Sequence, residues 1–382
     1  MESEERTNPT VPGPRPGFSR RRFLKRAGVI GAAIPVAGGL IASACYDDPT
    51  GGPAQEGGVP PQNQQPGTPK PTTPAQPAWV KIDQDHKNGV LNFLKQQKAP
   101  LTKGKGMEEL APRIENGVKV WNLTIDEVDW EVAPGQVEKG RGYNKQIPGP
   151  TLRATVGDRV RINVTNNLEE STAVHWHGLL VPNAMDGVPY VTQDPIEPGK
   201  TFTYEFTVRN QGSHMYHSHH DSADQVNRGL LGAFIVMPQN RADYPQYDKE
   251  VILIMNDSLL GFTLNGKGFP ATDAIVAKKG ERILIRWMNE GMLYHPMHLH
   301  GMSMTVFQRD GYPINPPYEC DTIDVPPGNR FDCIINATEP GLWAFHCHVL
   351  SHAEYEGGFF GLVTVLAVED ENFKVADILA KV

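Results

Sequence analysis

The chain has 382 residues, 39% of them hydrophobic, which is enough to form more than one compact core. Its 36 basic and 44 acidic side chains give a formal charge of −8, so no basic excess is available to neutralise phosphates, which argues against nucleic-acid binding. The 38 glycines and 33 prolines are typical of a β-rich chain with many turns, and four cysteines are too few for a disulfide framework.

The first 45 residues have the pattern of an export signal. The run Ser19 to Lys25 (SRRRFLK) resembles the twin-arginine signal, and a broken apolar stretch from Ala27 to Ala44 follows it. This resemblance implies export to the periplasm or the cell surface. Two interpretations of Cys45 stay open: it follows an ordinary cleavage site at residues 42–44, or it is acylated and becomes a lipid anchor.

The next segment, residues 46–110, reads as a linker and an N-terminal extension. Its first part, residues 46–78, is rich in proline and glycine and has no apolar period, which is typical of a disordered, extended linker. Further on, three apolar residues indicate a short amphipathic helix that ends before Pro100: Val90, Leu91 and Leu94.

Short β-rich runs begin at Val118 and are separated by glycine, proline and asparagine turns. Residues 159–164 and 201–208 alternate in hydrophobicity, as half-buried strands do. Residues 250–255 form a continuous apolar run, which is typical of a more fully buried strand. We therefore predict an all-β fold for this part of the chain.

Matching residues recur at equal intervals of 21, 18 and 13 residues, in the same order, in both halves of this β-rich region. The matched pairs are Gly157–Gly178 with Gly280–Gly301, Gly199–His217 with Gly328–His346, and His219–Gly232 with His348–Gly361. Such a repeat predicts two copies of one β-sandwich. We place the first domain at residues 111–240, the second at 248–370 and a C-terminal tail at 371–382.

Four His-x-His pairs stand at repeated positions: His175/His177, His217/His219, His298/His300 and His346/His348. On a strand, residues i and i+2 point to the same face, so each pair directs two imidazoles to one side. One such pair is most often structural. Eight imidazoles at matching places in two domains indicate a metal site, and imidazole suits copper, zinc and iron.

Cys347 stands between the last two histidines, so strand alternation turns it away from the face that they use. His352 follows five residues later, and His295 opens the preceding motif. One thiolate with two imidazoles is the ligand set of a blue copper site. A single strand would therefore serve two metal sites, one on each face.

These motifs resemble the four copper-binding signatures of the multicopper oxidases: HWHG, HSH, HPMHLHG and HCHVLSH. The resemblance runs from about Gln146 to Val365 and includes the segment Met185 to Pro189. It implies two tandem cupredoxin-like Greek-key β-sandwich domains. The chain length suggests the two-domain, small-laccase-like branch, since the spacer domain of three-domain enzymes has no counterpart here.

The resemblance also implies four coppers per chain: one type 1, one type 2 and two type 3. His295, Cys347 and His352 would bind the type 1 copper, and His175 and His298 the type 2 copper. The type 3 pair would be held by the six remaining imidazoles of the four pairs: His177, His217, His219, His300, His346 and His348.

The internal register indicates that only the second domain has a type 1 site. Its four positions, His295, Cys347, His352 and Phe359, correspond in the first domain to Thr172, Ser218, Ala223 and Leu230. At the axial position, where a methionine is usual in the family, the glycine register places Phe359, whereas counting rigidly from His352 gives Gly357; with either residue no thioether would ligate. A missing axial donor should raise the type 1 potential, which suits oxidation of phenols.

By resemblance, the chain is a laccase-like oxidase that takes single electrons from a phenolic donor through the exposed edge of a ligand histidine. Electrons would pass through Cys347 to His346 and His348, and dioxygen would be reduced to water. Asp186 is a candidate proton relay, or else only a turn residue before Gly187. Two-domain relatives assemble head to tail, which implies a homotrimer with clusters between subunits.

Three other functions stay open. A metal-ion oxidase for Cu(I), Fe(II) or Mn(II) would use the same coppers, although the sequence has no long methionine-rich insertion. A copper nitrite reductase would carry its type 1 site in the first domain and lack the full set of eight cluster histidines. A non-enzymatic, lipid-tethered copper electron carrier would leave those eight histidines unexplained.

The remaining chemistry-bearing residues have weaker signals. Cys320 and Cys333 flank a proline-glycine turn and could pair across a hairpin or miss each other by one residue. Glu354 and Glu356 could meet substrate at the rim of the site or be solvated charges. For His214 and His220 we expect supporting or surface roles, and His86 receives no role.

Overall fold

The computed structural model describes residues 77–257, 259–355 and 357–382. The export signal, Cys45, most of the proposed linker and Glu356 lie outside the described residues. Within the described part, no helix is long and apolar enough to cross a membrane.

The N-terminal extension contains one long helix, α2 (Ala78–Lys98), and two short helices occur elsewhere, α3 (Ser222–Gln225) and α4 (Val375–Leu379). The prediction of a helix that ends before Pro100 is confirmed, but α2 starts earlier than the apolar pattern suggested. The first turns of α2 contain Trp79 and Ile82, but these side chains are 62% and 42% exposed, so that half of the helix has no buried apolar face. Phe93 is the buried anchor, and its ring stacks on Phe269 at 5.2 Å.

The first β-sandwich consists of two sheets. One contains β1 (Arg113–Glu115), β2 (Val118–Ala133), β3 (Gln136–Tyr143), β5 (Arg159–Asn166) and β7 (Thr201–Thr207). The other contains β4 (Gly149–Thr155), β6 (Val174–His175), β8 (Gly212–Ser218) and β9 (Leu231–Met237). The predicted run 159–164 lies within β5, and the predicted run 201–208 covers β7. Both runs alternate in hydrophobicity because one face of each strand is buried.

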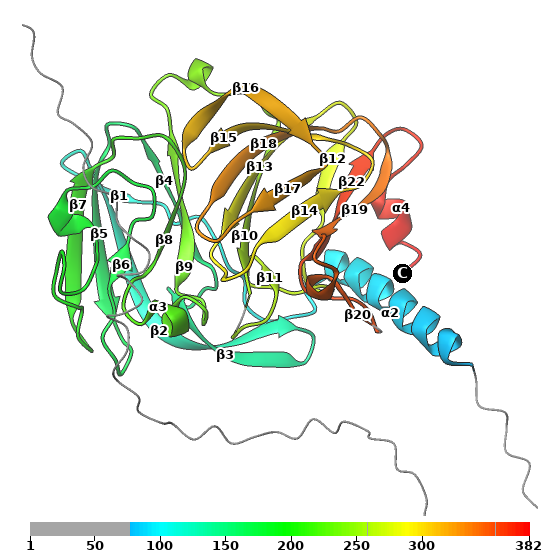
Figure 1. Ribbon diagram of the computed structural model, residues 1–382, viewed down its shortest axis with the longest axis horizontal. Helices are drawn as coiled ribbons and strands as arrows, with labels where there is room; N and C mark the ends of the chain where they lie inside the picture. The colour runs from blue at the N-terminus through cyan, green and yellow to red at the C-terminus, as the bar shows by residue number, and fades with distance from the viewer. Residues whose placement is uncertain (1–76, 258, 356) are drawn as a thin grey trace, which may run out of the picture. The chain divides into compact units, whose positions relative to one another are not determined.

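The second β-sandwich also consists of two sheets. One contains β10 (Lys249–Asn256), β11 (Thr263–Leu264), β13 (Arg282–Asn289), β15 (Met304–Arg309), β16 (Tyr312–Cys320) and β18 (Arg330–Asn336). The other contains β12 (Ile275–Lys278), β14 (His295–Leu299), β17 (Thr322–Val325), β19 (Gly341–Cys347) and β22 (Val363–Glu369). A small hairpin of β20 (Glu354–Tyr355) and β21 (Gly358–Phe359) stands apart from both sheets (Figure 1).

The two sandwiches share one strand plan. In the first, β2 runs parallel to β5, and β5 pairs with β7; in the second, β10, β13 and β18 repeat this order. Likewise β4-β9-β8-β6 corresponds to β12-β22-β19-β14, with the first pair parallel in each case. The predicted duplication of one β-sandwich is therefore confirmed. The first histidine of each His-x-His pair lies at or near the end of one of the corresponding strands β6, β8, β14 and β19, and the second histidine lies just beyond that end.

A mixed apolar and polar seam joins the two sandwiches. Met215 and Ile235 from the first pack with Ile254 and Met288 from the second in one buried cluster. Beside them, the fully buried Arg286 donates from Nη1 to Oδ2 of Asp332 at 2.9 Å, to Tyr244 Oη at 2.7 Å and to Ser213 Oγ at 3.0 Å. A buried charge that is paired and hydrogen-bonded in this way fixes one relative placement of its neighbours.

Candidate metal centres

A cysteine and two histidines meet inside the second sandwich. His295 begins β14, Cys347 ends β19, and His352 ends a short 3-10 helix, η3 (Leu350–His352). The Sγ atom of Cys347 lies 3.8 Å from Nδ1 of His295 and 3.7 Å from Nδ1 of His352. Cys347 and His295 are fully buried and His352 is 8% exposed. We call these three residues the thiolate triad.

The donor atoms of the thiolate triad fit one shared metal ion. Metal–sulfur and metal–nitrogen bonds of ordinary length, opened to a tetrahedral angle, would separate the two ligand atoms by about 3.6 Å, close to the observed distances. Burial raises the pKa of the Cys347 thiol to about 11, so a metal must displace its proton on binding. Burial also lowers the pKa of His352, which keeps its imidazole neutral and able to ligate. This ligand set is the one that copper prefers in blue sites.

Asp257, just after β10, supports His295 from behind. Its Oδ2 lies 2.7 Å from Nε2 of His295, and its carboxylate also accepts the backbone N–H groups of Met292 and Leu293. Burial acts to raise the pKa of Asp257, but these hydrogen bonds outweigh it and lower the pKa. A carboxylate on the outer nitrogen fixes the tautomer that leaves Nδ1 free to face Cys347. No spacing in the sequence pointed to Asp257.

Aromatic rings flank the ligand histidines of the thiolate triad. His295 is fully buried and His352 is 8% exposed, so of the two ligand histidines only His352 keeps an edge toward solvent. The ring of Phe262 stacks on His352 at 4.3 Å between centroids, and it meets His295 edge-on at 6.5 Å. Phe262 lies in the connection between β10 and β11, outside every motif, so the sequence gave no sign of it. Phe262 therefore closes one face of the His352 ring.

Phe359, the predicted axial residue, contacts other rings. Its ring lies 5.9 Å from Phe269 and 6.1 Å from His86, and among the described residues it makes no ring contact with His295 or His352. The aromatic neighbour of the thiolate triad in this structure is Phe262. The axial assignment of Phe359 thus stays a prediction without geometric support.

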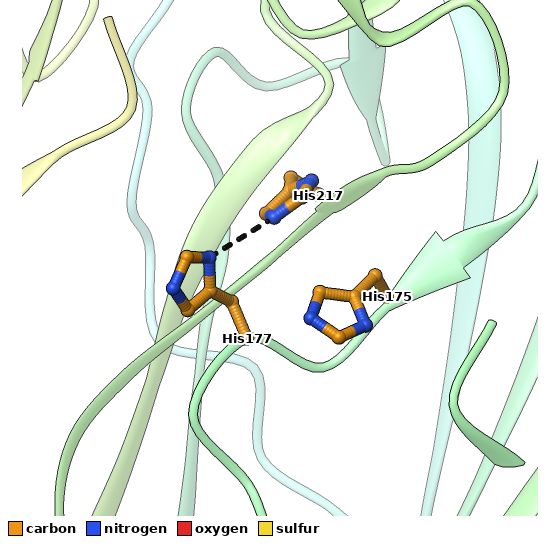
Figure 2. A group of neighbouring side chains, drawn as sticks. All are labelled: His175, His177 and His217. Carbon is orange, nitrogen blue, oxygen red and sulfur yellow. Dashed lines mark hydrogen bonds between the residues drawn. The ribbon is translucent and has the colours of Figure 1, made fainter. Parts of the chain in front are cut away.

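Four imidazoles gather at one end of the first sandwich: His175, His177, His217 and His219. Figure 2 shows three of them pointing toward one another, with Nδ1 of His177 3.2 Å from Nε2 of His217. The ligand atoms of these three residues all lie within 4.8 Å of one another. Burial, reinforced by neighbouring positive groups, lowers the pKa of His177 to about 2 and that of His217 to about 4. Neutral imidazoles this close together are suited to hold metal ions.

Asp186 contacts the first of these histidines. Nδ1 of His175 lies 2.8 Å from the Asp186 backbone oxygen and 3.5 Å from its carboxylate Oδ1. The backbone contact positions the imidazole, and the carboxylate is 34% exposed, so it contacts both the histidine and solvent. Both interpretations of Asp186, a turn residue and a proton relay, are compatible with this placement.

Four more imidazoles gather at the corresponding end of the second sandwich: His298, His300, His346 and His348. Nε2 of His300 lies 3.1 Å from Nε2 of His346, and the rings of His298 and His348 are 5.5 Å apart. The outer nitrogens are held by oxygens: Nδ1 of His298 lies 2.9 Å from Thr322 Oγ1, and Nδ1 of His346 lies 3.0 Å from the Cys347 carbonyl. Such contacts orient metal-binding imidazoles.

The eight imidazoles form two separate half-sites within one chain. Every ring contact that the described residues make among these eight stays within its own sandwich. The first half-site instead shares a cavity of about 270 Å³ with Glu290, Met292 and Gly328 of the second sandwich. The outermost rings, His219, His300 and His348, are exposed.

In the first sandwich, three hydrogen-bonded polar residues occupy the position that corresponds to the thiolate triad of the second. Ser218 and Thr172, which stand where the repeat puts Cys347 and His295, both donate to Oε1 of Gln225, at 2.6 and 2.8 Å. All three are fully buried. The hydroxyl groups and the amide satisfy one another, so no ligand set remains there. Nothing in the sequence indicated that Gln225 occupies this position.

The other histidines and the glutamate that the sequence singled out belong to neither group of candidate metal ligands among the described residues. His214 is fully buried beside Arg330, and burial followed by that charge lowers its pKa to about 3. Nε2 of His86 on α2 lies 4.0 Å from Oε1 of Glu354, which is exposed on β20. His220 is half-buried after β8.

Cys320 and Cys333 are both free thiols. The expected hairpin between them does not exist, since β17 pairs with β14 in one sheet while β18 pairs with β13 and β15 in the other. β15 stands between the strands that carry the two cysteines, with Cys320 opposite Met304 and Cys333 opposite Val306. One strand of separation keeps the sulfur atoms from direct cross-strand pairing.

Comparison with known proteins identifies the class. Two family models, each described as a multicopper oxidase, match residues 124–241 and 242–369. Among solved structures, a blue copper oxidase from Nitrosomonas europaea is 32% identical, with 66% of this chain and 86% of that one covered and a TM-score of 0.62. The multicopper oxidase mgLAC is 35% identical, with 67% and 87% covered and a TM-score of 0.62.

The chain belongs to the multicopper oxidase family, and its structural neighbours are of the two-domain, small-laccase-like kind. Among curated proteins, copper resistance protein A of Pseudomonas syringae is 26% identical over 67% of this chain and 52% of its own length. The chain spans about half the length of the curated relatives that it matches.

Proposed function

We propose that the protein is a laccase-like oxidase that couples one-electron oxidation of phenolic donors to four-electron reduction of dioxygen to water. The observation that carries the proposal is the placement of Cys347. Its thiol is buried in the thiolate triad, while the residues on either side, His346 and His348, belong to a half-site of four imidazoles. Two metal centres would thus share one strand end, as a donor-oxidising site coupled to an oxygen-reducing site requires.

The residues present fit copper at both centres. The thiolate triad would hold the type 1 copper, His175 and His298 the type 2 copper, and the six other paired histidines the type 3 pair. When bound, copper would supply the one-electron redox chemistry that neither an imidazole nor a carboxylate can perform.

The chain's own groups hold, connect and shield these ligands. Asp257 fixes the orientation of His295, and Phe262 keeps water from one face of His352. Two peptide bonds connect Cys347 to His346 and His348, which makes a short covalent path between the centres. The Asp186 carboxylate, 3.5 Å from His175, is placed to pass protons from solvent to the oxygen-reducing site.

Oxygen uptake by the copper-loaded protein with a phenolic donor tests this function. We expect four donor electrons to be consumed per dioxygen, without peroxide, since water is the proposed product. The Cys347→Ser variant should lose the blue colour and donor oxidation, whereas the control Cys320→Ser should keep both, because Cys320 lies outside the ligand sets. A blue, fully loaded protein that consumes no oxygen with any phenol would contradict the proposal.

A metal-ion oxidase is the second candidate, because a relative is named for copper resistance. The same oxygen-uptake assay with Cu(I), Fe(II) and Mn(II) as donors separates the two functions. Values of kcat/KM for a metal ion far above those for every phenol would favour the second candidate. Uptake of one electron per chain without oxygen consumption would favour the electron carrier.

We also propose that the oxygen-reducing site is completed between copies of the chain, in a homotrimer. Two observations support this: the two half-sites make no ring contact within one chain, and each leaves at least one imidazole exposed. A head-to-tail ring would bring the first half-site of each copy against the second half-site of the next and would leave none unpaired.

Complementation between two inactive variants tests this assembly. One variant carries His175→Ala and His177→Ala, and the other carries His346→Ala and His348→Ala. If sites form between copies, unfolding and refolding the two variants together should restore part of the oxygen uptake, since some interfaces then join two intact half-sites. If each site is built within one chain, the mixture should stay as inactive as its components.

Export remains a proposal that rests on the sequence of residues 19–45. Replacing Arg20 and Arg21 with lysine should abolish export through the twin-arginine route, measured by cell fractionation. Cys45→Ser separates the two interpretations of Cys45. Loss of membrane association in this variant supports a lipid anchor, whereas unchanged fractionation supports an ordinary cleavage site.

A further inference from the structure

A continuous series of aromatic rings leads from the protein surface to the thiolate triad. Tyr355 on β20 is 61% exposed, and its ring lies 5.2 Å from Phe360. Phe360 lies 6.2 Å from Phe262, which stacks on His352 at 4.3 Å. These rings therefore form a path of ring contacts from the surface to His352.

A cavity of about 690 Å³ lies at the outer end of this series. Its walls come from four segments: helix α2, the turn between β2 and β3, the connection between β11 and β12, and the β20–β21 hairpin with the residue after it. Figure 1 shows α2 beside the hairpin. The two segments approach closely, since a Cβ atom at position 358, which is a glycine, would lie only 3.1 Å from Cα of His86. The segments are far apart in sequence, so the cavity exists only because α2 is docked on the second sandwich.

The docking of α2 is specific. Phe93 stacks on Phe269, and the Gln97 side chain donates to the Thr272 carbonyl and accepts from the Ala274 N–H. A helix held by a buried ring and two hydrogen bonds is a fixed wall, so it can define the shape of a binding site.

The lining of the cavity favours a small aromatic molecule. It presents the rings of Phe269, Tyr355, Phe359 and Phe360, together with the amides of Asn88, Asn92 and Gln136. Among the described residues, Asp85 is the one carboxylate in the lining, and no described lysine, arginine or histidine lines it. The volume suits a ligand of drug-like size or less, and aromatic walls with a few polar groups are typical of such sites. A lone carboxylate is too few hard ligands to select a metal ion.

We propose that this cavity binds a neutral or cationic phenolic reductant and that its electron enters through Tyr355, Phe360 and Phe262 to His352. The proposal rests on the oxidase function and names its donor site. The phenol O–H bond breaks: the proton passes to solvent, with the amides and Asp85 available to hold the hydroxyl group. The electron would pass along the rings to His352, where a type 1 copper held by the thiolate triad would supply the one-electron oxidant, and a phenoxyl radical would leave.

A substitution that fills the cavity tests the binding step. Asn88 is exposed on α2 and lines the cavity, whereas Lys87 is exposed on the same helix outside it. We expect Asn88→Trp to raise KM for 2,6-dimethoxyphenol by about tenfold or more, and Lys87→Trp to leave it unchanged. Binding of 1,2,3-trimethoxybenzene, which lacks an oxidisable O–H, should weaken equally in Asn88→Trp when measured by calorimetry.

A second substitution tests the electron path. Phe360→Leu should lower kcat for the phenol by about tenfold while binding of 1,2,3-trimethoxybenzene, the blue absorption and the type 1 potential stay as in the parent. Unchanged kcat, or a shifted potential, would overturn the role of this ring. An equal loss in Asn88→Trp and Lys87→Trp would overturn the cavity assignment.

Ferrocyanide is a small anionic donor that this cavity would not favour. It therefore distinguishes a wrong donor site from a wrong oxidase function. We expect Asn88→Trp to oxidise it with oxygen uptake as fast as the parent does. If the parent consumes oxygen with ferrocyanide but the cavity variants treat phenols normally, the donor site is wrong and the oxidase stands. If the parent consumes oxygen with neither donor, the proposed function itself fails.

Discussion

At the scale of residues, the Cys347 thiol and its two histidine neighbours are stabilised by burial and by a carboxylate that orients one of the imidazoles. Cys347 and His295 are fully buried, and Asp257 holds the outer nitrogen of His295. The sequence predicted the ligands because their spacing is fixed by strand pairing. It could not predict Asp257 or Phe262, because each comes from a loop whose path depends on tertiary packing and not on a local pattern.

The Asp257→Asn substitution should raise the potential of the type 1 copper. It removes a negative charge that favours the cupric state through His295, and it weakens the constraint on the imidazole. We expect copper affinity at this site to fall by about 10- to 100-fold. A redox titration of the blue absorption, with copper analysis, measures both. An unchanged potential with full copper retention would show that Asp257 has no influence on the ligand.

Glu290 is a residue whose pKa should appear in the pH dependence of stability. It is 9% exposed, its Oε1 has no hydrogen-bond partner among the described residues, and burial raises its pKa to about 8 against the opposing effect of Arg330. Between about pH 4.5 and pH 8 the folded protein retains a proton that the unfolded chain loses. Stability therefore falls as pH rises through this window, by up to about 1.4 kcal/mol per pH unit.

The Glu290→Gln variant isolates this effect, because glutamine has nearly the same shape and does not titrate. We expect the copper-free variant to gain stability relative to the parent as pH rises from 5 to 8, and to match the parent's slope below about pH 4.5. Urea unfolding at a series of pH values measures the difference. Parallel pH profiles for the two proteins would refute a raised pKa at Glu290.

At the scale of elements, patterns with a local period were predictable and docked segments were not. The alternating runs became β5 and β7, and the repeat intervals located the corresponding strands of both sandwiches. The spacing of Val90, Leu91 and Leu94 predicted a helix, but its length and its packing against Phe269 depend on contacts 175 residues away. The supposed hairpin between the two cysteines failed because turn residues do not specify which sheet the next strand joins.

Helix α2 should depend on one aromatic anchor. Phe93 is 4% exposed, so Phe93→Ala removes a buried ring and should cost about 3–5 kcal/mol in the free energy of unfolding or of α2 docking. The control Val90→Ala, at a position 43% exposed on the same helix, should change stability by less than about 0.5 kcal/mol. Hydrogen exchange of α2 amides reports undocking directly. Equal exchange rates in both variants would contradict the anchoring role of Phe93.

At the scale of the whole molecule, duplication explains both what the chain contains and what it lacks. Each sandwich supplies four imidazoles at one end, but only the second has a thiolate triad, because Gln225 closes the corresponding place in the first. The repeated spacing predicted this division. The separation of the two half-sites within one chain was not visible in the sequence, because it depends on how the sandwiches pack through Arg286 and its partners.

The most direct test of the account is the number of electrons that one chain stores and delivers. The fully copper-loaded protein is reduced without oxygen by a phenolic donor, and then exposed to oxygen while peroxide is assayed. The account predicts four electrons taken up per chain and one dioxygen converted to water on reoxidation, with Cys347→Ser unable to accept electrons from the same donor. Uptake of a single electron per chain, or release of peroxide as the main product, would contradict it.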